Sequence, residues 1–139
     1  MCIRDRFNME ADSLNSSILA EDAAPGTPEF NLFIKEVRKE MTVKCGQKCT
    51  AIRRMIVPEK YLEDVHIALG KELSRVSIGN PLSKEVRMGA LASKDQVQEV
   101  RDRVAEIAKT AEIIYGSLDA IDVIAVSYTH LTLPTICSV

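Results

Sequence analysis

The chain has 139 residues, of which 46% are hydrophobic and 27% are charged, with a formal net charge of −2. This composition is typical of one ordinary globular domain, and the near-balance of charge excludes a strongly basic nucleic-acid or membrane-surface binder. No apolar run is long enough to span a bilayer, and the first residues lack the apolar stretch of a secretory signal. We therefore expect a reduced, cytoplasmic protein without nucleic-acid or membrane partners.

The two ends of the chain form an inverted pair at the level of codons. One back-translation of residues 1–5 has a reverse complement that encodes residues 126–130. An adapter joined to both ends of a DNA fragment produces such a pair, whereas the alternative is a genuine C-terminal strand rich in β-forming residues. We interpret residues 1–6 and 126–139 as adapter-derived and exclude them from the fold prediction. Three reactive side chains fall in these ends: Cys2, His130 and Cys137.

The first part of the natural segment predicts a short strand or loop and then a helix. Residues 7–22 mix polar and apolar side chains and end in a turn, and a loop containing proline and glycine follows. Thr27 is placed as a helix N-cap, with Pro28 at the first helical position. Apolar residues then recur at helical spacing, and we expect the helix to end near Cys45 because Gly46 follows. The apolar face consists of Phe30, Phe33, Ile34, Val37 and Met41.

The remaining segment alternates strands and helices. Residues 51–57 read as a strand closed by a proline, and residues 62–76 as a second amphipathic helix. Residues 78–93 form an irregular connection. Ser93 and Gln96 then make a capping box for a third helix, and a short strand follows it. The third helix has its apolar stripe at Val97, Val100, Val104, Ile107 and Ala111. Three amphipathic helices with short strands indicate an α/β fold.

Two cysteines four residues apart, Cys45 and Cys49, are the first candidates for chemistry. Cys49 follows a helix and a glycine turn, where a side chain can protrude. Lys44 and Lys48 favour its thiolate, while the preceding helix C-terminus opposes it. The alternative is that each thiol is a small buried hydrophobic side chain. A redox pair or a zinc site is disfavoured, because the spacing is CxxxC and His66 is the one histidine outside the ends. We predict no metal site.

Glu10 is the second candidate. It lies among Met9, Ala11 and Leu14. A carboxylate in a partly apolar setting has a raised pKa and can act as a general base. The alternative is an ordinary solvated charge. The spacing of the residues alone leaves both readings open.

Four stretches in this order, MEADSLN, EMTVKCGQKCTAIRR, VSIGNPL and MGALAS, resemble the aldehyde dehydrogenase superfamily over nearly all of residues 7–125. GQKCT is the most specific of them, because the family places its nucleophilic cysteine two residues after the Gly-Gln. That position is Cys49. Glu10 falls where the family carries its general base. This chain has Glu-Ala-Asp-Ser there in place of the usual Glu-Leu-Gly-Gly, as does the branch of bifunctional ring-opening enzymes of phenylacetic acid degradation.

The resemblance implies a fragment of the aldehyde dehydrogenase fold and covalent catalysis. Cys49 would attack an aldehyde, NADP or NAD would accept a hydride, and Glu10 would activate water to release the acid. The expected substrate is a coenzyme A-linked semialdehyde from aromatic ring cleavage, and the parent is expected to be a homo-oligomer. The cofactor-binding residues are unknown, because that half of the enzyme is mostly absent. The isolated chain is therefore expected to be inactive and, with apolar helix faces exposed, poorly behaved.

The resemblance also predicts a domain division. Residues 7–26 would end the cofactor-binding domain, and residues 27–125 would be a partial catalytic domain carrying the nucleophile loop. One alternative within the same class is the semialdehyde dehydrogenase of benzoyl-coenzyme A degradation. An alternative of a different class is a non-catalytic helical interaction module in which both cysteines are buried.

Overall fold

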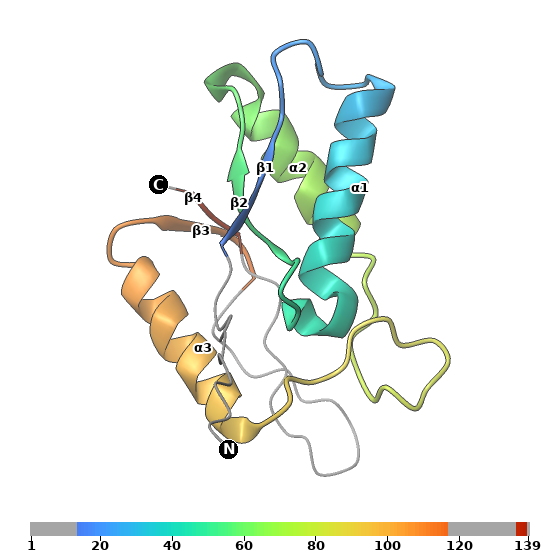
Figure 1. Cartoon of the computed structure of the whole chain (residues 1–139), viewed down its shortest axis with the longest axis vertical. Coiled ribbons are helices and arrows are strands. Elements are labelled where there is room, and N and C mark those ends of the chain that lie inside the picture. The colour runs from blue at the N-terminus through green and yellow to red at the C-terminus, as the bar shows by residue number, and fades with distance from the viewer. Residues whose placement is uncertain (1–13, 117–135, 139) are drawn as a thin grey trace, which may run out of the picture.

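The computed structural model describes residues 14–116 and 136–138 (Figure 1). Glu10, Cys2 and His130 lie outside the described residues. The described elements, in chain order, are β1 (Asn15–Ile18), α1 (Pro28–Thr42), the 3-10 turn η1 (Val43–Gly46), β2 (Ile52–Ile56), the 3-10 turn η2 (Glu59–Tyr61), α2 (Leu62–Leu73), α3 (Lys94–Ile107), β3 (Glu112–Tyr115) and β4 (Ile136–Ser138). Three helices with short strands confirm the predicted α/β class.

The unit formed by β1, α1 and β2 organises the fold. The two strands pair in parallel, with Asn15 opposite Ile52 and Ile18 opposite Ile56. A parallel pair needs a long connection, and α1 supplies it. The register shifts directly after Asn15, so the ladder is irregular where β1 approaches the segment before β2. The pairing joins residues on both sides of the predicted domain division at residue 26, and that division stays a prediction.

The core lies between α1, α2 and the strands (Figure 1). The buried residues of this cluster are Leu19, Ala23, Phe30, Ile34, Val37, Val65, Leu69 and Leu73. Burying each large aliphatic side chain contributes about 1.5–3 kcal/mol before the entropy of ordering is counted. The apolar stripe predicted for the first helix is therefore confirmed as core-facing. That of the second helix is confirmed in part, because Val65, Leu69 and Leu73 are buried whereas Leu62 is 38% exposed.

Helix α1 begins as predicted and ends earlier than predicted. The Thr27 hydroxyl accepts a hydrogen bond from the Phe30 amide, and Pro28 occupies the first turn. The expected end near Cys45 is wrong: α1 ends at Thr42, because Val43 has extended backbone angles (φ −64°, ψ 123°). The second helix is also shorter than predicted. It ends at Leu73, and Val76 lies beyond it.

Helix α3 has the predicted cap and a largely uncovered apolar stripe. The Ser93 hydroxyl accepts a hydrogen bond from the Gln96 amide. Along the helix, Val97 is buried, but Val100 is 37% exposed and Ile107 is 45% exposed. The hydrophobic pattern that predicts the helix is therefore only partly used in packing within this chain.

The short strand predicted near residue 112 is confirmed as β3, which pairs with β4 in an antiparallel arrangement. Strand β4 lies inside the range 126–139 that we interpret as adapter-derived. Its backbone pairing does not depend on where its sequence came from, so that interpretation stays a prediction.

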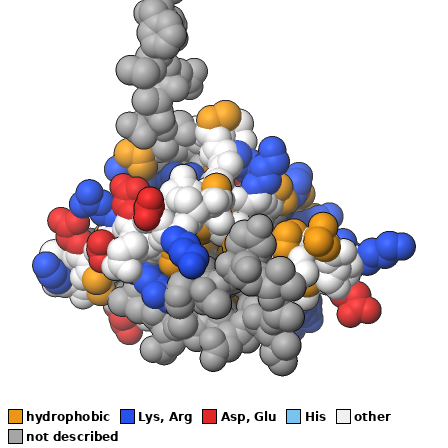
Figure 2. Space-filling model, turned by 90° about the horizontal axis from the view of Figure 1, so that it is seen from below, with side chains coloured by type: hydrophobic (Ala, Val, Ile, Leu, Met, Phe, Trp, Pro, Cys, Tyr) orange, Lys and Arg blue, Asp and Glu red, His pale blue; other side chains and the backbone are white. Residues whose placement is uncertain are grey.

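Figure 2 shows a face on which acidic and basic side chains are interspersed around the grey atoms. Among the described helices, none is long and apolar enough to cross a membrane.

Candidate active site

The segment between α1 and β2 turns sharply through three left-handed residues. Lys44, Cys45 and Gly46 have φ values of 53°, 56° and 69°. Side chains with a Cβ rarely adopt this conformation, which costs roughly 1–2 kcal/mol at each such residue. Gly46 takes it without that cost. The turn carries the chain away from α1 and into residues 47–51, which we call the nucleophile loop after the role predicted for Cys49.

An arginine from β2 holds this turn in place. The Arg53 guanidinium donates through Nη2 to the Gly46 carbonyl at 2.8 Å. The same carbonyl accepts from the Lys48 amide at 2.9 Å. A Cβ at position 46 would lie 3.3 Å from both Arg53 Nη1 and the Met41 carbonyl oxygen. Gly46 is therefore required by close contact as well as by its backbone angles.

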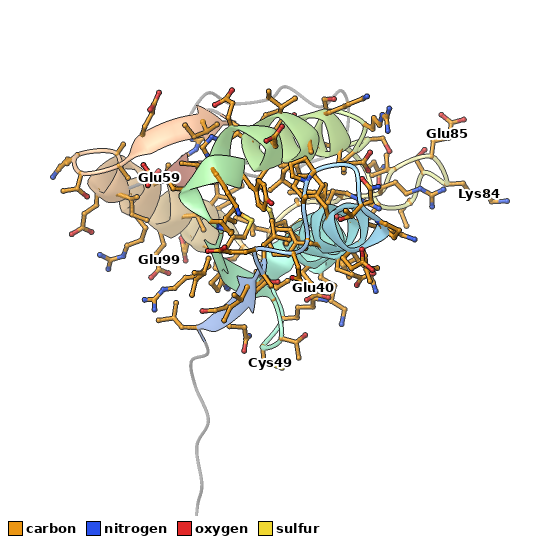
Figure 3. All side chains as sticks on the ribbon, turned by 90° about the horizontal axis from the view of Figure 1, so that it is seen from above. Glu40, Cys49, Glu59, Lys84, Glu85 and Glu99 are labelled. Atoms are coloured by element: carbon orange, nitrogen blue, oxygen red, sulfur yellow. The ribbon has the colours of Figure 1, made fainter. Side chains whose placement is uncertain are left out.

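The Cys49 side chain is exposed on the nucleophile loop. Figure 3 shows it at the periphery of the molecule. Its backbone carbonyl accepts a hydrogen bond from the Asn15 side chain of β1 at 2.5 Å. The alternative in which both thiols are buried is therefore wrong for Cys49. An exposed thiol on a loop tied by backbone contacts is accessible to a small electrophile.

Cys45 has a different environment. Its side chain is half-buried, and its thiol donates to the Gly89 carbonyl at 2.7 Å. Burial raises the pKa of the Cys45 thiol above its ordinary value of 9.0, so the neutral form is favoured. Cys45 thus joins the turn before the nucleophile loop to the connection that precedes α3. The two cysteines are chemically distinct, with one thiol exposed and the other used in packing.

Lys48 does not stand beside Cys49 as an uncommitted charge. Its ammonium forms an ion pair with the Glu40 carboxylate of α1, at 2.7 Å from Nζ to Oε1. The expectation that this lysine stabilises the Cys49 thiolate is therefore not supported by its contacts. The pair anchors the nucleophile loop to the last turns of α1. Lys44, the other predicted contributor, is exposed.

Helix α3 also contacts the nucleophile loop. The Gln47 side-chain amide donates to Gln96 Oε1 at 2.7 Å, close to the N-terminus of α3. Reading the sequence missed this contact, as it missed the contributions of Asn15 and Glu40. Each partner is an ordinary polar residue, distant in the sequence from the loop that it holds. No local pattern in the sequence could have identified these partners.

Glu10, the predicted base, cannot be placed, since it lies outside the described residues. The structure does describe the strand that follows it in the sequence. β1 lies against the nucleophile loop through Asn15.

His66 lies on α2 and is half-buried. Within residues 14–116 and 136–138, no group of three His, Cys, Asp or Glu side chains is arranged to hold a metal ion.

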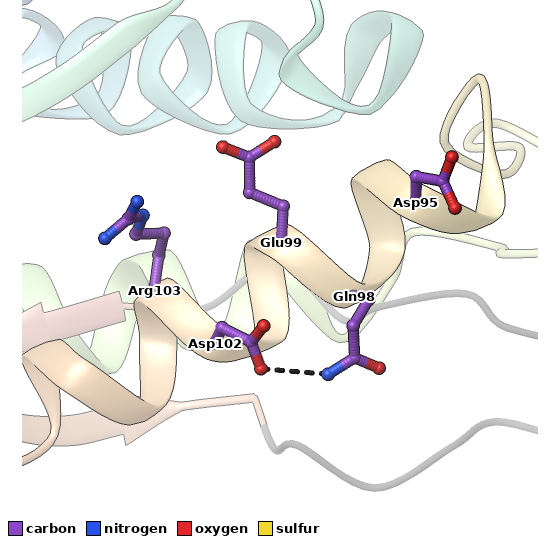
Figure 4. Close-up of a pocket in the computed structure, with 5 residues that line it drawn as sticks. All are labelled: Asp95, Gln98, Glu99, Asp102 and Arg103. Carbon is purple, nitrogen blue, oxygen red and sulfur yellow. Dashed lines mark hydrogen bonds between the residues drawn. The ribbon is translucent and has the colours of Figure 1, made fainter.

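A shallow, open depression lies along α3 (Figure 4). It is lined by Asp95, Gln98, Glu99, Asp102 and Arg103. The Gln98 amide donates to the Asp102 carboxylate at 2.9 Å, a contact within one turn of the same helix. The depression is acidic and comes from a single exposed helix face. Its lining does not include Gln96, the α3 residue that contacts the nucleophile loop.

Comparison with known proteins gives one consistent result. The sequence profile described as "Aldehyde dehydrogenase family" matches residues 4–136. A 3,4-dehydroadipyl-CoA semialdehyde dehydrogenase from Aromatoleum evansii is 47% identical over 111 residues, which cover 80% of this chain and 22% of that protein. A 3-succinoylsemialdehyde-pyridine dehydrogenase from Pseudomonas sp is 28% identical over 134 residues, or 96% of this chain and 27% of that protein.

Solved structures show the same fold. Betaine aldehyde dehydrogenase from Staphylococcus aureus in complex with NAD+ has a TM-score of 0.80 and 21% identity, over 92% of this chain and 24% of that chain. The NAD+ complex of aldehyde dehydrogenase from Bacillus cereus has a TM-score of 0.73 and 24% identity, over 91% and 24%. The chain thus spans about a quarter of the length of the proteins that it matches.

Proposed function

Because the chain belongs to the aldehyde dehydrogenase family, we propose that it forms part of an NAD(P)-dependent dehydrogenase that oxidises an aldehyde to an acid through a thioester on Cys49. The observation that carries this proposal is the exposure of the Cys49 thiol on an anchored loop, while Cys45 is half-buried and hydrogen-bonded. Covalent catalysis on a carbonyl needs one accessible thiol at a defined position.

The chemistry assigned to this chain has two steps. In the first, the Cys49 sulfur bonds to the aldehyde carbon, and the carbonyl electron pair moves to oxygen to give a thiohemiacetal. A nicotinamide cofactor bound by the whole enzyme would supply the hydride acceptor for that carbon, so that a thioester on Cys49 would remain. In the second step, Glu10 accepts a proton from water, the water oxygen bonds to the thioester carbon, and the sulfur leaves as a thiolate. The product is a carboxylic acid.

The depression on α3 does not fit a dinucleotide. The depression on α3 is lined by three carboxylates and one guanidinium, and its net negative charge would repel a pyrophosphate. The cofactor would thus be held by other parts of the whole enzyme. For this reason we propose that the isolated chain is inactive. Formation of NADH or NADPH by the isolated chain with any aldehyde would contradict this.

The proposed substrate is a coenzyme A-linked semialdehyde from aromatic ring cleavage. The Aromatoleum evansii relative supports this class, because that protein is named as a dehydrogenase of a CoA semialdehyde. We retain the ring-opening branch of phenylacetic acid degradation as the first candidate, and the enzyme of benzoyl-coenzyme A degradation as the alternative. A carboxylate at Glu10 favours hydrolysis of the thioester over its transfer to coenzyme A. A cytoplasmic homo-oligomer is part of the same proposal.

The test uses a complete enzyme. Residues 7–125 of this chain replace the aligned residues of the Aromatoleum evansii relative, and we call the product the grafted enzyme. We expect it to form NADH or NADPH from a coenzyme A-linked semialdehyde. Cys49→Ser should abolish this activity, and the matched control Cys45→Ser should retain most of it. Activity that survives Cys49→Ser in a folded grafted enzyme would refute the assignment.

The role of Glu10 has its own readout in the grafted enzyme. Glu10→Gln should preserve a rapid first burst of reduced cofactor, equal to the number of Cys49 sites, and slow the turnover that follows. The reason is that only release of the thioester requires the base. Equal slowing of burst and turnover would place Glu10 outside the hydrolytic step.

A further inference from the structure

The Asn15 side chain connects β1 to the nucleophile loop at two points. Its amide nitrogen Nδ2 donates to the Cys49 carbonyl at 2.5 Å and to the Ala51 carbonyl at 3.2 Å. A primary amide has two N–H donors, so one side chain serves both acceptors. The two carbonyls flank Thr50, and the amide therefore restrains the loop on both sides of that residue.

The two anchored residues differ in how else they are held. Ala51 is completely buried, so packing already fixes its position. Cys49 and Thr50 are exposed, so their side chains gain little from packing. The Asn15 amide thus holds the exposed Cys49 backbone in a set position relative to the buried Ala51. The direction of the Cys49 Cα–Cβ bond follows from this backbone, so the Asn15 contact bears on where the thiol points.

The strand that carries Asn15 adds a second constraint. Asn15 lies opposite Ile52 in the parallel pair, and the register shifts between Asn15 and Ser16. The side chain thus leaves β1 where the regular ladder is interrupted and reaches the loop that precedes β2. Glu10 lies in the chain segment that leads into this strand. A single amide therefore joins the segment after the proposed base to the residue that carries the proposed nucleophile.

We propose that Asn15 is a positioning residue, which directs the Cys49 thiol by fixing the carbonyls of Cys49 and Ala51. This inference rests on the proposed function, because it concerns the attack of that thiol on an aldehyde. Attack needs the sulfur and the carbonyl carbon held near contact distance and correctly oriented. A shift of about 1 Å at a reacting atom can cost on the order of a hundredfold in rate.

The test variant is Asn15→Asp in the grafted enzyme. It keeps the size of the side chain, but it removes both donors and places carboxylate oxygens against two carbonyl oxygens. We expect kcat to fall by about tenfold or more, while KM for the aldehyde changes little, because the loss concerns alignment in the transition state. Ser16→Ala, an exposed neighbour on the same strand, serves as the matched control and should keep wild-type kcat and KM.

A second measurement separates positioning from loss of structure. Iodoacetamide reacts with any accessible thiol and needs no alignment with a bound aldehyde. The half-buried Cys45 labels faster only if its surroundings open, so it reports local unfolding. In Asn15→Asp, the ratio of the Cys49 and Cys45 labelling rates should therefore stay close to that of the unsubstituted grafted enzyme. Faster labelling of Cys45 together with the fall in kcat would assign Asn15 a structural role only, and would overturn the inference.

The remaining outcomes are also decisive. An unchanged kcat in Asn15→Asp, with the grafted enzyme active, overturns the positioning inference and leaves the proposed function standing. An inactive but folded grafted enzyme refutes the proposed function, and the inference falls with it. If Asn15→Asp fails to fold, Asn15→Ser, with one short donor, replaces it. If Asn15→Ser folds but its kcat stays below that of the unsubstituted grafted enzyme, positioning is supported. If it folds and also has the full kcat, positioning is opposed.

Discussion

The Lys48 ammonium lies 2.7 Å from the Glu40 carboxylate, and the two side chains are only 21% and 17% exposed. The nucleophile loop is therefore tied to α1 by a largely buried ion pair. The second carboxylate oxygen of Glu40, Oε2, is buried and has no hydrogen-bond partner among the residues that the structure describes. Removing the lysine would leave this carboxylate without its counter-charge.

Lys48→Met should therefore destabilise the fold by about 1–3 kcal/mol, the cost of leaving a buried acceptor unsatisfied. Urea unfolding followed by circular dichroism measures the change. The matched control is Lys39→Met at the exposed Lys39–Glu36 pair, whose side chains are 53% and 43% exposed. This control should cost less than about 0.5 kcal/mol. Equal costs at the two sites would mean that burial of the Lys48 pair has no energetic effect.

Gly46→Ala should destabilise the chain more than Gly26→Ala does. Both glycines have positive φ, 69° and 90°, so both substitutions incur the left-handed backbone cost of about 1–2 kcal/mol. Only at position 46 would the added Cβ meet neighbours, at 3.3 Å, whereas nothing lies within 4 Å at position 26. The difference in melting temperature between the two variants therefore measures the cost of the close contacts that the added Cβ makes at position 46. A larger loss for Gly26→Ala would contradict this packing.

The Cys45 thiol should make stability dependent on pH in the alkaline range. Burial raises its pKa in the folded chain above the ordinary 9.0. The unfolded thiol therefore loses its proton first as pH rises, and unfolding is favoured. The contribution is full below pH 9.0 and is lost as pH rises through the folded pKa. Unfolding free energies across this range should fall less steeply for Cys45→Ser, which has no thiol to titrate at that position. Identical slopes would show that Cys45 is not shielded from solvent.

The apolar stripe of α3 should promote self-association of the isolated chain. Val100 and Ile107 are 37% and 45% exposed. Exposed apolar patches of this kind favour association. The double variant Val100→Lys/Ile107→Lys should lower light scattering at a given concentration, while the melting temperature changes little. Val97→Lys should unfold the chain locally, because that side chain is 6% exposed. Undiminished scattering in the double variant would place the association surface elsewhere.

Helix positions could be predicted from the sequence because their causes are local. The Thr27 cap, the Ser93 cap and the apolar stripes of α1 and α2 all depend on residues within a few positions of one another. The end of α1 was missed by a few residues. Gly46 signals a stop, but the helix already ends at Thr42, because Val43 is extended and the two residues after it take left-handed angles that propensity does not anticipate.

The contacts that hold the nucleophile loop could not be predicted in this way. Asn15 and Cys49 are 34 positions apart, and Gln47 and Gln96 are 49 apart. Such pairs arise from how the elements pack, and an asparagine or glutamine in isolation has no distinctive pattern. The assignment of Cys49 as nucleophile came from family resemblance, and its role, like that of Glu10, stays a prediction. The structure adds that the Cys49 thiol is exposed and that Cys45 is half-buried.

The parallel pairing of β1 and β2 has a consequence for the order of events during synthesis. The Asn15 amide meets the Cys49 carbonyl only after the intervening α1 has emerged and folded back, because the partners are 34 positions apart. Closing such a span is slow compared with forming a helix. On a nascent polypeptide the Cys49 thiol is therefore present before the contact that restrains its backbone has formed. The time for which the thiol is open to oxidants is therefore set by how fast the two strands join.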